Sequence, residues 1–270
     1  MEFSSFQKAR SVWAAGRARV MNDSVLFRHV FCAGGSDKML LRLTGSTVYR
    51  VRLNGIFLAY GPARGPKGYF RIDEIPFCAA DGSNVLEIEV SGANVNSYYY
   101  MDHASFLQAE VLRNDVVICW TGEHFKAFDL TQERMQKAPR YCFQRMFQEV
   151  YSVTPERKEL KELKQEVFPD FRYLARTVPL PDYKIDFSYK PVRTFRRRRL
   201  DCKVEHIARI SEPREDFKCY SNGELAYDTF ALLKQLTCDD QGPIISTLYC
   251  GKINNTGFIR LKVNCKVPGR

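Results

Sequence analysis

Two short apolar runs joined by Asn54-Gly55 constrain the fold more than any other feature of the chain. Val48–Leu53 alternates in residue type, so its tyrosine, valine and leucine share one face while two arginines point the other way. Ile56–Tyr60 follows the Asn-Gly pair directly. Both turn residues adopt positive φ readily, which a two-residue hairpin turn requires. The sequence therefore predicts an antiparallel β-hairpin over residues 48–60.

The rest of the first half repeats this pattern of short strands between turns. In Val85–Val90, apolar residues that we expect to face inward alternate with Glu87 and Glu89, which we expect to face solvent. Aromatic residues favour strands and are abundant, with 19 Phe and 14 Tyr. Further strands are predicted at Phe27–Phe31, Met39–Leu43, Phe106–Leu112 and Val116–Trp120. The expected fold class is all-β, with a sandwich or jelly roll in the first half.

The composition changes near Tyr151, where we place a boundary between two domains, residues 1–150 and residues 151–270. Thr154 and Pro155 suit the N-cap and first position of a helix, and apolar residues recur at helical spacing up to Pro169. This predicts a short linking helix over residues 155–167. Alternating segments then resume, so the second domain is expected to be a second, incomplete β-sandwich. These segments are Ile185–Tyr189, Lys203–Ile210 and Phe258–Val263, while Glu224–Leu236 fits either a strand or a helix.

The net charge of +10 is unevenly distributed. Residues 1–150 hold 18 Lys and Arg against 15 Asp and Glu, and residues 151–270 hold 23 against 16. Six basic residues fall within Lys190–Arg199, a run that could contact nucleic-acid phosphates. No nucleic-acid-binding motif accompanies it. We interpret the run as a structural or interface feature and keep nucleic-acid binding as a minor alternative.

No targeting or membrane-spanning segment is visible in the sequence. Met1–Val12 lacks an apolar run of signal-peptide length, and no stretch is long enough to cross a bilayer. The nine cysteines are scattered singly, without the Cys/His spacing of a zinc site. We therefore expect a cytoplasmic protein with reduced thiols, no metal and no cofactor.

Four segments carry a resemblance to a known family. Tyr49–Phe57 leads through Gly61–Pro66 to Tyr69–Glu74, and Asn94–Tyr100 leads to Ser105–Glu110. The other two segments are Ala14–Phe31, with Trp13 ahead of it, and Asn255–Ile259. In this order they resemble the N-terminal region of the bacterial α-L-rhamnosidase family of glycoside hydrolases, across nearly the whole chain.

The resemblance implies a galactose-binding-like jelly roll followed by a second β-sandwich. In that family an (α/α)₆ barrel comes next and carries the catalytic acid and base, and nothing in this sequence matches the barrel. The resemblance therefore implies a non-catalytic accessory region that is inactive alone. Its partners would be the catalytic barrel of the parent enzyme and a rhamnose-containing carbohydrate.

The local carboxylate pairs do not suit glycoside hydrolysis, which needs two carboxyl groups across one bond, roughly 6.5–9.5 Å apart for inversion. Asp73 and Glu74 are adjacent on a predicted strand and point to opposite faces. No catalytic residue is therefore predicted. In the loop Gly61–Gly68, Arg64 is expected to bond carbonyls or a carboxylate such as Asp73.

Sugar sites combine an aromatic face with polar side chains that bind hydroxyl groups. Alternation in Tyr98–Tyr100 is expected to bury at least one of the three rings. The candidate carbohydrate-binding residues are Trp13, Arg64, Tyr69, Asn94, Asn96, Tyr98 and Tyr99. A free-standing, lectin-like carbohydrate-binding module therefore remains the main alternative to the accessory region of an enzyme.

Overall fold

The computed structural model describes residues 2–138, 140, 142, 144–151, 159–181, 190–196 and 244–249. The chain divides into two compact units. The first comprises Met1–Ala138, Phe143–Ser152 and Lys158–Pro181, and the second comprises Pro139–Cys142, Val153–Arg157 and Asp182–Arg270. Every regular element of the described residues is a β-strand, so the predicted all-β class is confirmed.

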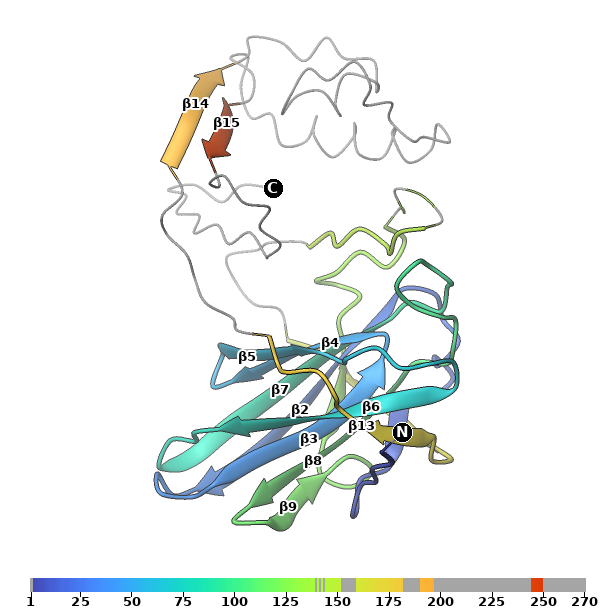
Figure 1. Cartoon of the computed structure of the whole chain (residues 1–270), viewed down its shortest axis with the longest axis vertical. Helices are drawn as coiled ribbons and strands as arrows, with labels where there is room; N and C mark the ends of the chain where they lie inside the picture. The colour runs from blue at the N-terminus through green and yellow to red at the C-terminus, as the bar shows by residue number, and fades with distance from the viewer. Residues whose placement is uncertain are drawn as a thin grey trace. The chain divides into compact units, whose positions relative to one another are not determined.

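The first unit is a sandwich of two mostly antiparallel sheets, which lie one over the other in Figure 1. One sheet has seven strands, and its β9 (Val116–Trp120) pairs with β8. The other six strands follow the order β12 (Gln165–Phe168), β1 (Ser11–Ala14), β8 (Phe106–Arg113), β3 (Met39–Ser46), β6 (Tyr69–Phe77) and β13 (Arg172–Ala175). β13 runs parallel to β6.

The second sheet of this unit has six strands. Their order is β11 (Glu162–Leu163), β10 (Lys126–Asp129), β2 (Asp23–Ala33), β7 (Gly82–Gly92), β4 (Val48–Leu53) and β5 (Ile56–Gly61). Because β2 and β7 pair over eleven residues each, they form the long centre of this sheet.

The core lies between the two sheets, where alternate residues of the facing strands meet. Leu41 and Leu43 of β3 are fully buried, as are Val51 of β4 and Ile88 of β7. Burying a large aliphatic side chain contributes about 1.5–3 kcal/mol, so this double layer supplies much of the driving force for folding. The alternation seen in the sequence is therefore the alternation between core and outer face.

The Asn54-Gly55 hairpin is confirmed. Asn54 has φ of 51° and Gly55 has φ of 77°, the conformation expected of a two-residue turn between β4 and β5. The Asn54 side chain also accepts a hydrogen bond from the Val85 N–H at 2.8 Å, which ties the turn to β7. The other strands expected in residues 27–120 are present as β2, β3, β7, β8 and β9.

The predicted linking helix is wrong where the structure describes it. Residues 162–163 and 165–168 are strands β11 and β12, which pair with β10 and β1. Edge pairing with existing strands outweighs the helical spacing of the apolar residues, because a short isolated helix is only marginally stable in water. Residues 155–158 of the predicted helix lie outside the described residues.

The first unit also reaches past residue 150, where the sequence predicted its end. β12 and β13 complete the two edges of the first sheet, and Tyr173 and Leu174 of β13 are buried. The chain therefore returns to its first sandwich after the change in composition.

The described part of the second unit contains one antiparallel pair, β14 (Lys190–Arg196) with β15 (Ile244–Tyr249). The basic run predicted as a structural feature thus begins in a strand, while residues 197–199 lie outside the described residues. The predicted segments at 185–189, 203–210, 224–236 and 258–263 also lie outside them. Among the described residues, no helix has the length and apolar character needed to cross a membrane.

Candidate functional site

An exposed aromatic cluster of the first unit lies on the loop between β7 and β8. Tyr98 is 71% exposed and Tyr99 is 36% exposed. Arg64 and the pair Gln144-Arg145 contact these two rings from distant parts of the sequence. We call these five residues the tyrosine platform.

The loop that carries the two tyrosines begins at Asn94, which has a positive φ of 50°. Its side-chain Nδ2 donates to the Val20 carbonyl at 3.0 Å and to the Ser105 hydroxyl at 2.8 Å. Asparagine is favoured in this left-handed conformation because its side chain bonds nearby backbone groups. Asn94 therefore fixes both ends of the loop instead of presenting its amide to solvent.

Hydrogen bonds within the loop hold the two tyrosines in place. The Ser97 hydroxyl accepts from the backbone N–H groups of Tyr99 and Tyr100 at 3.1 and 3.0 Å. The Asn96 side chain accepts from the Asp102 N–H at 2.9 Å. Both side chains satisfy backbone donors that an irregular loop would otherwise leave to water. Asn96 thus shapes the loop that carries the exposed rings.

Tyr100 is the ring of the triplet that turns inward, but the triplet lies in an irregular loop and Tyr98, two residues before it, is exposed, so the alternation expected of a strand is absent. Tyr100 is half-buried and hydrogen bonds to Tyr60 of β5. Burial raises the pKa of the Tyr100 hydroxyl, although Arg64 and Tyr60 oppose the rise. Burial is also the largest cause of the raised pKa of Tyr60. The pair anchors the loop to the sheet and leaves Tyr98 and Tyr99 outward.

The polar partners of the platform orient the two exposed rings. Gln144 donates from Nε2 to the Tyr98 hydroxyl at 2.6 Å and accepts from the Tyr98 N–H at 3.0 Å. Arg145 donates to the Tyr99 hydroxyl at 2.8 Å. The guanidinium carbons of Arg64 and Arg145 lie 4.9 and 5.5 Å from the centre of the Tyr99 ring. These are cation–π distances, so both arginines are drawn to the same ring.

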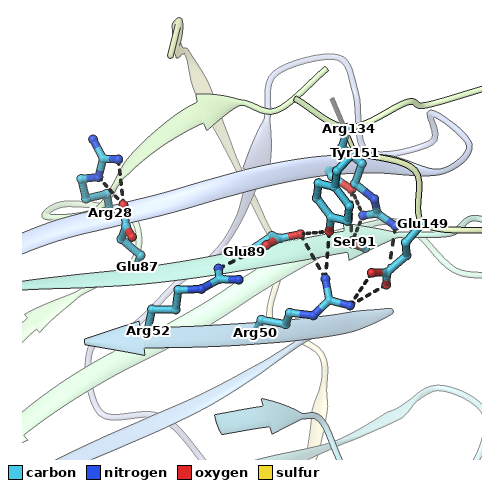
Figure 2. A network of polar contacts seen from close by, with 10 residues as sticks. Arg28, Arg50, Arg52, Glu87, Glu89, Ser91, Arg134, Glu149 and Tyr151 are labelled. Atoms are coloured by element: carbon cyan, nitrogen blue, oxygen red, sulfur yellow. Dashed lines mark hydrogen bonds and ion pairs between the residues drawn. The ribbon is translucent and has the colours of Figure 1, made fainter. Parts of the chain in front are cut away.

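A charged network fastens the segment that carries Gln144 and Arg145 (Figure 2). Arg50 of β4 donates to the Glu149 carboxylate at 2.6 Å, to Glu89 of β7 at 3.3 Å and to the Tyr151 hydroxyl at 3.0 Å. Tyr151 donates in turn to Glu89 at 2.8 Å. Hydrogen bonds between oppositely charged groups, such as those of Arg50 with Glu149 and Glu89, are stronger than a neutral hydrogen bond. We call residues 144–151 the cover segment.

The ionisation of this network is favoured by its own charges. Burial alone lowers the pKa of Arg50, but the Glu149 and Glu89 carboxylates outweigh burial and raise it above its usual value. Burial, followed by the charge of Glu89, raises the pKa of Tyr151. Arg50 therefore stays charged and Tyr151 stays protonated at neutral pH, as the hydrogen bonds require.

Arg134 joins the cover segment to the centre of the sheet. Its guanidinium is only 5% exposed and contacts the hydroxyls of Ser24 and Ser91 on β2 and β7. Arg134 also forms a β-bridge with Tyr151 and lies 4.0 Å from Glu149. A buried guanidinium is costly unless it is paired, so these contacts hold the residues around it in one arrangement.

The expectation that Glu87 and Glu89 face open solvent is wrong. Both are 7% exposed, although they lie on the outer face of β7. Arg28 donates to Glu87 at 2.7 and 2.9 Å, and Arg52 donates to Glu89 at 3.4 Å (Figure 2). Arginine side chains and Tyr151 cover the carboxylates, because long arginine stems can lie across a sheet while they pair with acids.

Trp13 and Tyr69 do not contact the platform in any described interaction. Trp13 is fully buried, and its indole Nε1 donates to Asp23 at 3.1 Å. Its ring therefore belongs to the core, and a surface sugar could not reach it. Tyr69 lies on β6, where Arg172 of β13 stacks on its ring at 5.6 Å and donates to its hydroxyl at 3.2 Å.

Asp73 is held by other groups than the predicted Arg64. It is fully buried, accepts from the Tyr49 hydroxyl, and accepts from Arg176 at 2.7 Å. Glu74 is exposed and pairs with Arg42 at 3.1 Å, so the two adjacent acids point to opposite faces as predicted. Arg64 contributes its carbonyl to the loop, which accepts from Arg71 Nε at 2.9 Å.

The platform thus brings together three predicted residues, Arg64, Tyr98 and Tyr99, and uses Asn94 and Asn96 to build the loop beneath them. Sequence reasoning missed Gln144 and Arg145. They lie 46 residues from their tyrosine partners in a stretch without strand or helix periodicity, so no local signal places them there. Among the described residues, no group of three or more His, Cys, Asp or Glu side chains could hold a metal ion.

Comparisons with known proteins identify the fold of this region. No family model matches the sequence, and no curated protein matches it significantly. A GH78 family rhamnosidase of Bacillus sp. GL1 matches in structure with a TM-score of 0.56 at 18% identity, over 66% of this chain and 20% of the enzyme chain. An α-L-rhamnosidase from Dictyoglumus thermophilum gives a TM-score of 0.45 at 12% identity, over 70% and 23% of the two chains.

A lectin from Pleurotus ostreatus gives a TM-score of 0.36 at 12% identity, over 62% of this chain and 46% of the lectin. Of these three similarities, the Bacillus enzyme alone exceeds a TM-score of 0.5. At 18% identity that similarity shows the fold, and the chain spans about one fifth of the enzyme's length. The chain is therefore an all-β protein with a sandwich of the kind found in part of an α-L-rhamnosidase.

Proposed function

We propose that this chain is a non-catalytic accessory region of an α-L-rhamnosidase-like glycoside hydrolase, which packs on a catalytic (α/α)₆ barrel. The observation that carries the proposal is the similarity to the Bacillus sp. GL1 rhamnosidase, which covers 66% of this chain but 20% of the enzyme. Fold similarity alone does not specify function, so the chemistry of the described residues must be consistent with it.

The acids of the first unit support a non-catalytic role. Asp73 is sealed by Tyr49 and Arg176, while Glu87 and Glu89 are covered by arginines. A catalytic pair needs two carboxyl groups that face one bond across open space. Among the described residues these local pairs offer no such arrangement.

Immunocapture from the source cells tests the proposal. An antibody raised against the purified chain should recover α-L-rhamnosidase activity, either in one longer polypeptide or in a complex. The isolated chain of 31.3 kDa should not hydrolyse p-nitrophenyl α-L-rhamnoside. Recovery of the chain without rhamnosidase activity would refute the accessory role, and turnover that stays with the isolated chain through purification would refute the non-catalytic one.

A second candidate function, a carbohydrate-binding module, is favoured by the exposure of Tyr98. A ring that is 71% exposed and oriented by Gln144 offers a flat apolar face beside hydrogen-bonding groups. Sugar sites use this combination of an aromatic face and a few fixed polar groups. We expect Tyr98→Ala to abolish retardation of the chain in affinity gels that contain a polysaccharide bound by the parent chain. Val116→Ala, at another exposed apolar position, should leave retardation unchanged.

A further inference from the structure

We propose that the tyrosine platform binds an acidic saccharide, with a sugar ring stacked on Tyr98 and a uronate carboxylate bound by Arg64. This inference rests on the proposed carbohydrate-binding function and names the chemical class of its ligand. The juxtaposition of exposed aromatic rings with arginines is its starting point.

The stacking surface is held in place before any ligand arrives. Gln144 bonds the Tyr98 hydroxyl and backbone, Arg145 bonds the Tyr99 hydroxyl, and Ser97 and Asn96 fix the loop. A surface that is already ordered pays less conformational entropy on binding. The hydrogen bonds of its neighbours therefore hold the Tyr98 ring in an exposed position.

The positive charge of Arg64 lies beside this surface and has no carboxylate partner in the described part of the chain. Arg64 is exposed and makes no ion pair with a described acid; its guanidinium lies against the Tyr99 ring. The nearby acids pair with other arginines. Glu149 is paired with Arg50, and Asp102 lies 3.5 Å from Arg19. The platform therefore complements an anionic ligand.

The geometry of a guanidinium selects the kind of anion. Its planar fork of N–H donors matches the two oxygens of a carboxylate. A uronate sugar offers such a carboxylate together with an apolar ring face. Arg64 is already packed over Tyr99, so a sugar on the tyrosines and its carboxylate on Arg64 can be bound at once.

Single-stranded nucleic acid also combines stacking with anionic charge. The saccharide is favoured because the sandwich has the fold found in an α-L-rhamnosidase, and because Gln144 and the tyrosine hydroxyls supply groups that bind sugar hydroxyls. Nucleic acid is therefore treated as a competing outcome of the test.

Isothermal titration of the full chain with a matched pair of ligands tests the inference. The pair is an α-(1,4)-linked trigalacturonate and its methyl ester, which share one sugar chain and differ in whether the carboxyl groups are charged or esterified. A hydrogen bond to a charged group is stronger than one to a neutral group, so the acid should bind about tenfold tighter than the ester. Arg64→Gln should remove most of this difference, and Arg64→Lys should restore part of it because a lysine keeps the charge but loses the fork.

Arg113→Gln is the matched control, because it removes an exposed arginine of β8 outside the platform and lowers the net charge equally. It should leave the preference for the acid intact. Equal binding of acid and ester, unchanged by Arg64→Gln, would overturn the inference and leave carbohydrate binding standing. If Arg64→Gln and Arg113→Gln lose the preference for the acid equally, that preference comes from nonspecific charge attraction. This result would also overturn the inference.

Two further outcomes separate this inference from the function on which it rests. If neither ligand binds, and neutral rhamnose-containing oligosaccharides do not bind either, carbohydrate binding itself is wrong. If an oligo-dT strand binds more tightly than every saccharide and Tyr98→Ala removes that binding, the platform is a nucleic-acid site and the inference is wrong.

Discussion

Two regions of the first unit use the same residue types in opposite ways. In the closed region, where β12 and β13 return to β1 and β6, the Tyr173 hydroxyl contacts Gln108 and Ser11, and all three residues are buried. On the tyrosine platform, tyrosine hydroxyls contact Gln144 and Arg145 on the surface. What differs is whether the ring is buried, since hydrogen bonding satisfies the polar groups in both places.

A tyrosine therefore belongs to the core where other parts of the chain bury its ring, and to a surface site where its ring stays exposed. The closed region needs chain from beyond residue 158 to exclude water, and burial then makes its polar groups structural. The platform has no covering strand in the described part of the chain, and its rings remain available to a ligand. Substitutions should therefore cost stability in the closed region and binding on the platform.

The largest expected effect is the loss of the closed region itself. A fragment of residues 1–150 lacks β11–β13, including buried Tyr173 and Leu174, and removes Arg176 from buried Asp73. Removing one partner of a buried ion pair alone costs about 3–5 kcal/mol. We expect residues 1–181 to melt cooperatively by circular dichroism and residues 1–150 to be largely unfolded or aggregated. Equal melting temperatures for the two fragments would contradict this account of the first unit.

The second prediction sharpens the contrast for a single aromatic ring. Trp13→Ala removes a fully buried indole that packs 5.8 Å from the Phe27 ring and donates to Asp23. Truncation of a buried tryptophan costs about 3–5 kcal/mol. Urea denaturation should show this loss, whereas saccharide affinity of the remaining folded protein should not change. A stable Trp13→Ala protein that has lost saccharide binding would contradict this prediction and show that Trp13 is part of the binding site.

The sequence predicted the centre of the fold better than its edges. Alternation located β4 and β7 because each is flanked by strands whose burial matches the pattern, with Val51 and Ile88 fully buried. β11 and β12 are two and four residues long, and their strand character comes from their partners β10 and β1. No local pattern announces such strands, so the helical spacing before Pro169 was misleading.

The candidate site was predictable to the same extent. The resemblance-bearing segment Asn94–Tyr100 pointed to the loop, and turn chemistry explains Asn94 and Ser97. Whether a candidate side chain is buried, however, depends on residues that are distant in the sequence. Trp13 and Tyr98 are similar as candidates in the sequence, and only pairing partners far along the chain separate the buried ring from the exposed one.

The third prediction compares two tyrosine hydroxyls. Tyr49 donates to buried Asp73 and is itself fully buried, whereas Tyr98 is exposed. Tyr49→Phe leaves a buried carboxylate with one donor fewer and should cost about 1–3 kcal/mol. Tyr98→Phe should change stability by less than about 0.5 kcal/mol, as is usual for surface positions. Chemical denaturation of both variants measures the difference, and equal costs would remove the distinction between the two regions.

A smaller effect is expected from pH, through His103 at the end of the platform loop. Its ring is packed against Phe70 at 4.8 Å. Burial lowers the pKa of His103, while the Ala104 carbonyl and Asp102 oppose the shift and Arg19 adds to it. The unfolded chain therefore takes up the proton first as pH falls below about 6.5.

The contribution of His103 to stability is thus complete above the unfolded pKa and is lost as pH falls from there toward the lower folded pKa, by about 1.4 kcal/mol per unit of difference. Denaturation series across this window should show His103→Gln less sensitive to acid than the parent. His29, whose pKa is also lowered mainly by burial, should retain its own share of the acid sensitivity. A variant with the parent's full sensitivity would show that His103 is accessible to protons in the folded state.

The most direct test of the central claim, that the exposed tyrosines form the binding site and the buried aromatics do not, is one NMR titration. The chain is labelled with ¹³C in tyrosine rings and ¹⁵N in tryptophan indoles, and trigalacturonate is added. The account predicts shifts for Tyr98 and Tyr99, assigned by their Phe variants, with the Trp13 indole and the Tyr49 ring unmoved. Shifts of the Trp13 indole or the Tyr49 ring, with Tyr98 and Tyr99 unchanged, would contradict it.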